Sequence, residues 1–219
     1  IIAAVGENVM LCGGNRDRQG LRLPGKQEQY VEELLATGKP VVLVVFGGRA
    51  QVISGLAERC AAVIQAWYPG EEGGHAVADI LYGNVSPSAK LAVSYPGEEI
   101  YTPICYSYPL PSSLSSLPSN KIQWPFGYGL SYTTFEYKHL AVVGEVRTNE
   151  SCVNLSFEVK NTGKVSSTEI AQIYISPAPD SPLTSHLSPL KLQGFARVSL
   201  DPRQSKTVRV KLYPEQLGI

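Results

Sequence analysis

The stretch IIAAVGENVMLCGGNRDRQGLRLPGKQ, residues 1–27, decides how the chain folds. Its apolar beginning, residues 1–5, has the composition of a buried strand. It opens into a polar segment, residues 6–27, that holds five glycines and a cluster of charged side chains. In α/β folds, sites lie where a buried strand gives way to such a loop, and loops held on a rigid scaffold carry function. The alternative is a solvated crossover loop, and the spacing alone does not decide between the two.

Alternating strand and helix patterns follow this stretch. Apolar residues at helical spacing predict a helix over residues 26–37, which Gly38 ends. The run VVLVVF, residues 41–46, is apolar on both faces, as in a central parallel strand covered by helices. A short helix, a strand, a second glycine-rich loop and a further helix are then predicted at residues 52–60, 61–68, 69–74 and 75–81. The alternation predicts a parallel α/β sheet with both glycine-rich loops at the same edge.

The last third of the chain changes to a period of two. Residues 152–160, 169–176 and 205–212 alternate between apolar and polar side chains and are separated by turn signals. Such a pattern predicts an antiparallel β-sandwich. We therefore divide the chain into an α/β domain at 1–134 and a β-sandwich at 135–219. Only about five strands are predicted where a complete sandwich has roughly seven, so we expect this domain to be truncated or completed by another segment.

Composition excludes several classes of protein. The chain has 219 residues with 19 Lys+Arg and 19 Asp+Glu, and this balance argues against a nucleic-acid or anionic-membrane partner. No apolar run approaches the roughly 20 residues that span a bilayer. The four cysteines are widely spaced, which argues against a zinc site and leaves a disulfide open. Because the chain starts directly on a strand without a methionine, we expect it to be the interior of a longer protein.

Several long motifs in collinear order resemble one family. RDRQGLRLPGKQ (16–27), GKPVVLVVFGGRA (38–50), AWYPGEEGGHAVADILYGNVSPSAKLAVSYP (66–96) and WPFGYGLSYTTFEY (124–137) are similar to the C-terminal half of glycoside hydrolase family 3, the β-glucosidases and β-xylosidases. The segments NTGKVSSTEIAQIYIS and SPLKLQGFARVSL, at 161–176 and 188–200, resemble the fibronectin type III-like domain that ends many members. The resemblance covers nearly the whole chain.

The resemblance implies that the catalytic residues come from two domains, one of which lies outside this sequence. Members of the family begin with a (β/α)₈ barrel that carries the aspartate nucleophile, and the second domain closes the pocket with its loops. In many members the opening loop of that second domain supplies an acid/base glutamate. A retaining glycosidase needs both carboxyl groups, about 5–5.5 Å apart, because one attacks the anomeric carbon while the other protonates the leaving oxygen.

The sequence departs from the family at this critical position. Aligned without gaps over residues 6–27, the acid/base glutamate falls on Gly14, which has no proton to donate. Three interpretations follow: an engineered knockout that traps substrate, a natural member that lost the activity, or another carboxylate in the same role, with Glu7 and Glu72 as candidates. We favour the first, because the surrounding motifs are intact.

Other residues near these loops have a structural and a functional interpretation. Arg16, Asp17 and Arg18 are expected to form an ion-pair network among themselves, with Arg16 as a candidate for sugar contact. Trp67 and Tyr68, at a strand end, are candidates for stacking on a sugar ring, against the alternative of packing beside the loop.

Taken together, the sequence predicts the C-terminal part of a retaining, exo-acting β-glycosidase. A β-glucosidase is favoured over a β-xylosidase, and a non-catalytic carbohydrate-binding or scaffolding module is the alternative from another class. By resemblance the expected partners are an oligosaccharide or aryl β-glycoside and the upstream barrel, with no metal or cofactor. A secreted or periplasmic location is inferred from the family only. The oligomeric state, a homodimer included, stays open.

Overall fold

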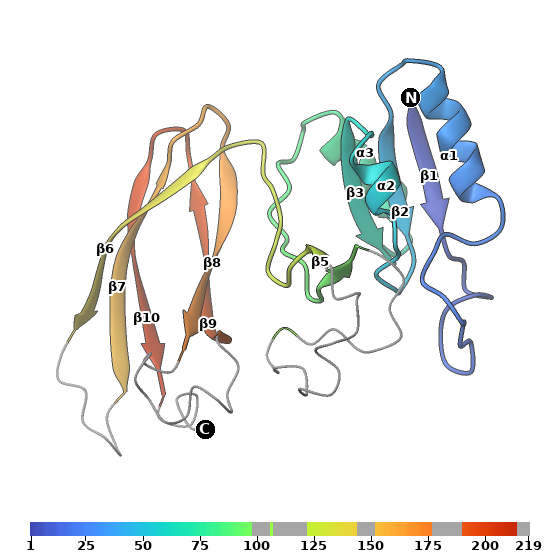
Figure 1. Cartoon of the computed structure of the whole chain (residues 1–219). Helices are drawn as coiled ribbons and strands as arrows, with labels where there is room; N and C mark the ends of the chain where they lie inside the picture. The colour runs from blue at the N-terminus through green and yellow to red at the C-terminus, as the bar shows by residue number, and fades with distance from the viewer. Residues whose placement is uncertain (98–105, 107–121, 144–151, 177–189, 214–219) are drawn as a thin grey trace. The chain divides into compact units, whose positions relative to one another are not determined.

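A computed structural model of the protein describes residues 1–97, 106, 122–143, 152–176 and 190–213 (Figure 1). The chain forms two compact units. In the described residues, the first unit contains 1–78, 92–97 and 122–126, and the second contains all the others. Each unit has its own sheets and is treated separately below.

The first unit is built on a parallel sheet of three strands in the order β1-β2-β3. These strands are β1 (Ile2–Gly6), β2 (Val42–Phe46) and β3 (Ala62–Trp67). Both neighbouring pairs are parallel, with Ile2 opposite Val42 and Val42 opposite Ala62. The central strand β2 is almost free of solvent contact because apolar side chains occupy both of its faces. The parallel α/β sheet predicted from the sequence is confirmed.

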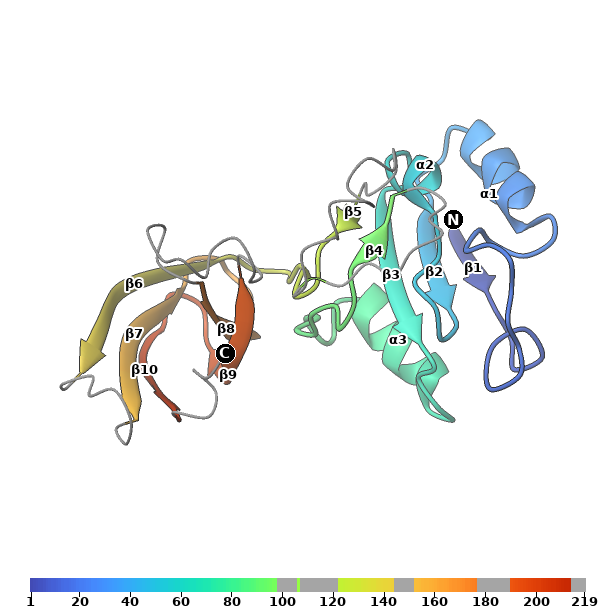
Figure 2. The same ribbon diagram turned by 60° about the horizontal axis from the view of Figure 1, so that its bottom comes forward.

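Helices cover both faces of this sheet. In Figure 2, α1 (Gln27–Ala36) and α2 (Ser54–Ala57) lie on one side and α3 (Gly73–Leu81) lies on the other. Helix α1 ends at the predicted place, since Gly38 takes a φ of 72° and donates its N–H to the carbonyl of Leu35 at 3.1 Å. The predicted helix over 52–60 is reduced to a single turn. No helix in the described part of the chain is long and apolar enough to cross a membrane.

A short hairpin closes the first unit. Strands β4 (Tyr95–Pro96) and β5 (Ile122–Trp124) pair antiparallel, with Tyr95 opposite Trp124. The Tyr95 ring is fully buried, with its centroid 5.4 Å from that of Trp124 and 6.3 Å from that of Trp67. Its hydroxyl donates to Oε1 of Gln65 on β3. These contacts pack the hairpin against the parallel sheet.

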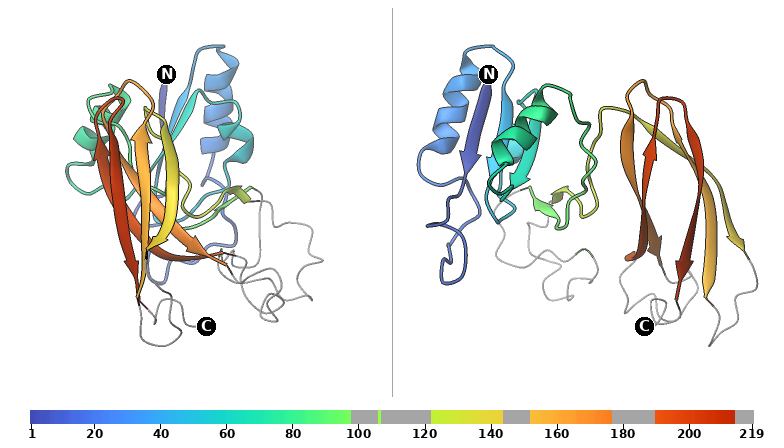
Figure 3. Two further views of the ribbon diagram at one scale, coloured as in Figure 1. Left: turned by 90° about the vertical axis from the view of Figure 1, so that its left-hand side faces the viewer. Right: turned by 180° about the vertical axis from the view of Figure 1, so that it is seen from behind.

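The second unit is an antiparallel β-sandwich. One sheet has the order β10-β7-β6 and the other pairs β8 with β9 (Figure 3). The five strands are β6 (Phe135–Val143), β7 (Val153–Asn161), β8 (Ser167–Ile175), β9 (Lys191–Leu200) and β10 (Ser205–Leu212). The core between the two sheets consists of Phe157, Val159, Ala171, Val198, Leu200 and Val208. An α/β domain followed by a β-sandwich is the fold class expected from the sequence.

Residues 79–91 pack with this sandwich. The Lys90 ammonium lies 3.3 Å from Oε2 of Glu169 on β8 and donates to the carbonyl of Gly129 at 2.9 Å. The hydroxyls of Ser86, Ser131 and Ser167 form a closed triangle of hydrogen bonds with separations of 2.9–3.1 Å. The division at 134/135 that the sequence predicts coincides with the start of β6. The packing of the structure places residues 79–91 with the sandwich as well.

The cysteines add no covalent bond among the described residues. Cys12, Cys60 and Cys152 are free thiols, and Cys105 lies outside the described part of the chain.

Candidate functional site

Three loops meet where the parallel strands end. The N–H of Glu7, just after β1, donates to the carbonyl of Phe46 at the end of β2, at 2.9 Å. The N–H of Gly47, just after β2, donates in the same way to the carbonyl of Trp67 at the end of β3, at 3.1 Å. The polar loop of residues 7–22 and the glycine-rich loop after Tyr68 therefore begin at the same edge, as expected for parallel strands.

Gly6 and Gln27 fix how the chain leaves the sheet. Gly6 has a φ of 131°, and a Cβ atom there would lie 1.8 Å from the carbonyl oxygen of Phe46, so only glycine fits. The Gln27 amide, at the start of α1, accepts from the Gly6 N–H at 2.6 Å and donates to its carbonyl at 3.0 Å. The end of β1 and the beginning of α1 are thereby joined on either side of the loop.

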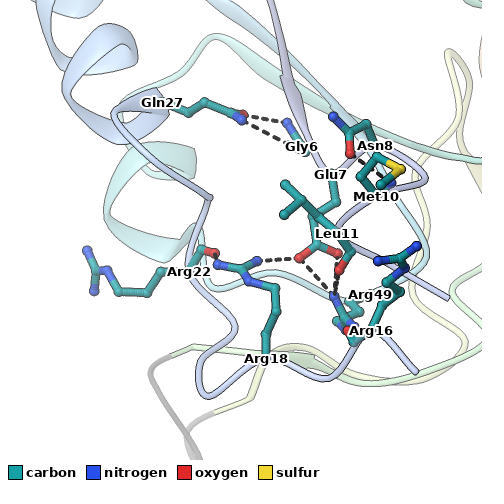
Figure 4. Close-up of polar contacts among 10 residues, drawn as sticks. All are labelled: Gly6, Glu7, Asn8, Met10, Leu11, Arg16, Arg18, Arg22, Gln27 and Arg49. Carbon is teal, nitrogen blue, oxygen red and sulfur yellow. Dashed lines mark hydrogen bonds and ion pairs between the residues drawn. The ribbon is translucent and has the colours of Figure 1, made fainter. Parts of the chain in front are cut away.

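Glu7 is the buried centre of the site (Figure 4). Its side chain is 0% exposed. Nη1 of Arg49 lies 3.0 Å from each of its carboxylate oxygens, and Nη1 of Arg18 donates to Oε1. Two guanidinium groups thus compensate one buried carboxylate, which would otherwise be costly to remove from water.

The same two arginines donate hydrogen bonds to backbone carbonyls of the loop. Arg49 donates to the carbonyl of Leu11 at 2.8 Å and, through Nη2, to the carbonyl of Arg16. Arg18 donates to the carbonyl of Arg22 at 3.2 Å. We call Glu7, Arg18 and Arg49 the arginine clamp. It joins the loop at Leu11, Arg16 and Arg22 to the edge of the sheet.

Gly14 lies on the exposed part of this loop. It is flanked by Gly13 and Asn15, whose φ values are 137° and 57°. Gly14 itself is not in the left-handed region, and no atom lies within 4 Å of a Cβ built on it. The backbone at this position therefore leaves room for the Cβ of an L-residue such as glutamate.

An aromatic side chain stands beside the loop. A Cβ built on Gly48 would lie 2.9 Å from both Sγ of Cys12 and Cε2 of Tyr68, so these three residues are in close contact. The pKa of the Tyr68 phenol is raised. The larger cause is a hydrogen bond with the Cys12 thiol, and the smaller is partial burial. Tyr68 is 55% exposed, whereas Trp67 packs towards Tyr95.

The two alternative carboxylates occupy opposite environments. Glu7 has both oxygens engaged and its side chain has no contact with solvent, which argues against contact with a substrate. Glu72 is 80% exposed, lies just before α3 and is 2.7 Å from Nδ1 of His75. Its place at the helix N-terminus accounts for its charge without catalysis.

The expected ion-pair network among Arg16, Asp17 and Arg18 does not form. Arg18 pairs with Glu7 instead, and Arg16 contributes its carbonyl oxygen to Arg49. Among the described residues, Asp17 has no ion pair. Neighbours in an extended loop point in different directions, so the buried carboxylate at the strand end takes the arginine.

Sequence reasoning missed Arg49 and Gln27 as members of the site. Arg49 follows two glycines at the end of a buried strand, which is the position that parallel pairing brings next to Glu7. A charged residue at that point was the available signal. Nothing in the sequence marked Gln27, because a glutamine at a helix start is ordinary.

A parallel α/β domain with a loop site at the carboxyl edge of its strands, followed by an antiparallel β-sandwich, defines the class of protein. The profile of the glycosyl hydrolase family 3 C-terminal domain matches residues 1–132, and that of the fibronectin type III-like domain matches residues 169–219. The chain therefore belongs to glycoside hydrolase family 3, and it carries the family's C-terminal domain followed by a fibronectin type III-like domain.

Individual relatives agree with this assignment. The chain is 35% identical over 225 residues to a β-xylosidase of Formosa agariphila and 33% identical over 231 residues to a periplasmic β-glucosidase of Salmonella typhimurium. These matches cover 100% and 99% of this chain but 31% and 30% of the two relatives. The crystal structure of a β-glucosidase from Listeria innocua in complex with glucose matches with a TM-score of 0.86 at 29% identity, over 98% of this chain and 31% of that one. The chain thus spans about a third of the length of the relatives it matches.

Proposed function

We propose that this chain is the C-terminal part of a retaining, exo-acting β-glycosidase whose acid/base position is residue 14. The substrate is a terminal, non-reducing β-D-glucosyl residue of an oligosaccharide or an aryl β-glucoside, and the nucleophile comes from a barrel domain of the complete protein. The substrate class is supported by two relatives, which are named a β-xylosidase and a β-glucosidase. A periplasmic or secreted location belongs to the same proposal, because one relative is named periplasmic.

One observation carries this proposal. Residue 14 lies on the exposed part of a loop that the arginine clamp ties to the sheet edge, and a Cβ atom there would meet nothing within 4 Å. A general acid needs such a place, because it must reach the leaving oxygen to within a hydrogen-bond distance of about 2.6–3.2 Å. With glycine at this position, the leaving group must depart without protonation by residue 14.

The test restores the carboxyl group. We expect Gly14→Glu in the complete protein to raise kcat/KM on an unactivated disaccharide by at least about 100-fold, because proton donation typically contributes 10²–10⁴-fold. An aryl glucoside with an activated leaving group should gain far less, since its leaving group departs without a proton. Azide should accelerate turnover of the glycine form only, by taking the place of the base-activated water.

Two outcomes would contradict this proposal. If Gly14→Glu changes neither substrate, the catalytic acid lies elsewhere, and Glu72→Gln becomes the next variant to measure. If neither form hydrolyses any glycoside yet both bind oligosaccharides, the chain belongs to a carbohydrate-binding protein. The ratio of kcat/KM for an aryl glucoside to that for an aryl xyloside decides between glucosidase and xylosidase activity. The xyloside is included because the Formosa relative is named a β-xylosidase.

A further inference from the structure

Arg49 bonds the polar loop on both sides of residue 14. Its Nη1 donates to the carbonyl of Leu11, three residues before Gly14, at 2.8 Å, and its Nη2 donates to the carbonyl of Arg16, two residues after it. The same Nη1 lies 3.0 Å from each oxygen of buried Glu7 (Figure 4). One planar group thus connects both stems of the loop to the end of the sheet.

We propose that Arg49 is a positioning residue that sets where residue 14 stands relative to the scissile bond. This role rests on the function proposed above, because it concerns proton transfer from that position. A displacement of about 1 Å from productive geometry costs on the order of 10²-fold in rate. Within the described structure, residues 9–17 make only local backbone hydrogen bonds and pair with no strand, so such precision requires a rigid anchor. The guanidinium of Arg49 is that anchor.

The geometry distinguishes the three members of the clamp. Glu7 orients Arg49 and supplies the negative charge that makes burial of the guanidinium favourable. Arg18 bonds the carbonyl of Arg22, eight residues after position 14, where the loop already forms a β-bridge with Val52. Arg49 alone among these three bonds carbonyls on both sides of Gly14.

Lysine cannot reproduce this arrangement. The guanidinium presents its donors in a fixed planar fork, whereas an ammonium is a compact point charge on a flexible stem. Arg49→Lys therefore keeps the charge beside Glu7 and loses the bridge between the two stems. A purely electrostatic role of Arg49 would be rescued by lysine, and a positioning role would not.

The first arm of the test measures the loop itself. Amide hydrogen exchange at short labelling times is compared between Arg49→Lys and Arg59→Ala, whose exposed partner Glu32 lies far from the loop in sequence. We expect exchange over residues 9–17 to rise about tenfold or more in Arg49→Lys, while β1, β2 and β3 keep their protection. Unchanged exchange relative to Arg59→Ala would overturn the proposal.

The second arm measures catalysis in the complete protein carrying Gly14→Glu. We expect Arg49→Lys to lower kcat/KM about 10²-fold on the unactivated disaccharide and only a few-fold on the activated aryl glycoside, because only the former needs a well-placed acid. Arg59→Ala should leave both values unchanged. Equal losses on both substrates would show a general structural effect and overturn the positioning role.

The experiments distinguish a failure of the proposed function from a failure of the positioning role alone. If Gly14→Glu with Arg49 intact gives no gain on the disaccharide, the function assigned to position 14 is wrong, and the positioning role falls with it. If Gly14→Glu gives the gain and Arg49→Lys then causes no selective loss, the function stands and the role of Arg49 is refuted.

Discussion

Two glutamates of this chain show how burial decides the role of a carboxyl group. The side chain of Glu7 is 0% exposed and is surrounded by two arginines, whereas that of Glu72 is 80% exposed beside His75. Removing one partner of a buried ion pair leaves charges without compensation, while solvent replaces the partner of an exposed one. The two residues therefore provide a matched comparison within one chain.

We expect Glu7→Gln to lower the free energy of unfolding by about 3 kcal/mol, because Arg18 and Arg49 then share no negative charge. Glu72→Gln, an identical chemical change at an exposed place, should stay within about 0.5 kcal/mol. Urea denaturation followed by circular dichroism measures both. Similar effects of the two substitutions would mean that water penetrates the clamp and that Glu7 is not buried in solution.

At the scale of elements, the parallel pairing of β1 with β2 creates the site. It places Gly6 opposite Phe46, so the loops that follow each strand leave the sheet side by side. The close approach of the two backbones at this point allows no side chain on Gly6. Gly14, eight residues later in the same loop region, has free space around it.

Gly6→Ala and Gly14→Ala should therefore differ strongly. The Gly6→Ala methyl would lie 1.8 Å from the carbonyl oxygen of Phe46 and would also require a left-handed φ, so we expect a loss of about 2 kcal/mol or more. Gly14→Ala should change stability by less than about 0.5 kcal/mol. The midpoint of thermal unfolding reports both. A neutral Gly6→Ala would show that the backbone can move apart here.

At the scale of the whole molecule, a polar cluster around the buried carboxylate of Glu169 joins three distant stretches of the second unit. The hydroxyl of Tyr137 on β6 donates to Oε1 of Glu169 on β8 at 2.9 Å, and Lys90 lies 3.3 Å from Oε2 of the same carboxylate. Burial, and then the charge of Glu169, raise the pKa of the Tyr137 phenol. The pKa of the Tyr137 phenol therefore differs between the folded and the unfolded chain, and its titration is coupled to folding.

The sign of the resulting pH dependence follows from this shift. In the unfolded chain Tyr137 loses its proton near pH 10, whereas the folded chain retains it to higher pH. Stability from this residue is therefore complete below about pH 10 and is lost as the pH rises towards the folded pKa. We expect the stability difference between the unsubstituted protein and Tyr137→Phe to be constant from pH 7 to 9 and to shrink above pH 10.

Urea titrations across this range measure that difference, and absorbance at 295 nm follows the phenols directly. One late-titrating phenol should disappear from the absorbance curve of Tyr137→Phe. A stability difference that is independent of pH up to 11.5 would contradict a partly buried Tyr137 phenol that is hydrogen-bonded to Glu169.

The sequence by itself determined the class of fold and the order of its elements. A doubly apolar run such as residues 41–46 can be buried only between two layers, and alternation over residues 205–212 suits a sheet with one face covered. It also indicated the family and the position where an acidic residue is expected, Gly14. The fold class is a local property, because it depends on the period of side chains along a few consecutive residues. The family and the place of Gly14 came from the resemblance of several long motifs.

Tertiary structure alone decided what surrounds that position. Arg49 reaches Glu7 across 42 positions of sequence, and Arg18 turns away from its neighbour Asp17 to the same carboxylate. The helical pattern over residues 52–60 shortened to the single turn Ser54–Ala57. Such outcomes depend on which strand ends lie side by side and on where a charge can be buried. The energy of a buried carboxylate is set by all the groups that converge on it, and local spacing does not reveal them.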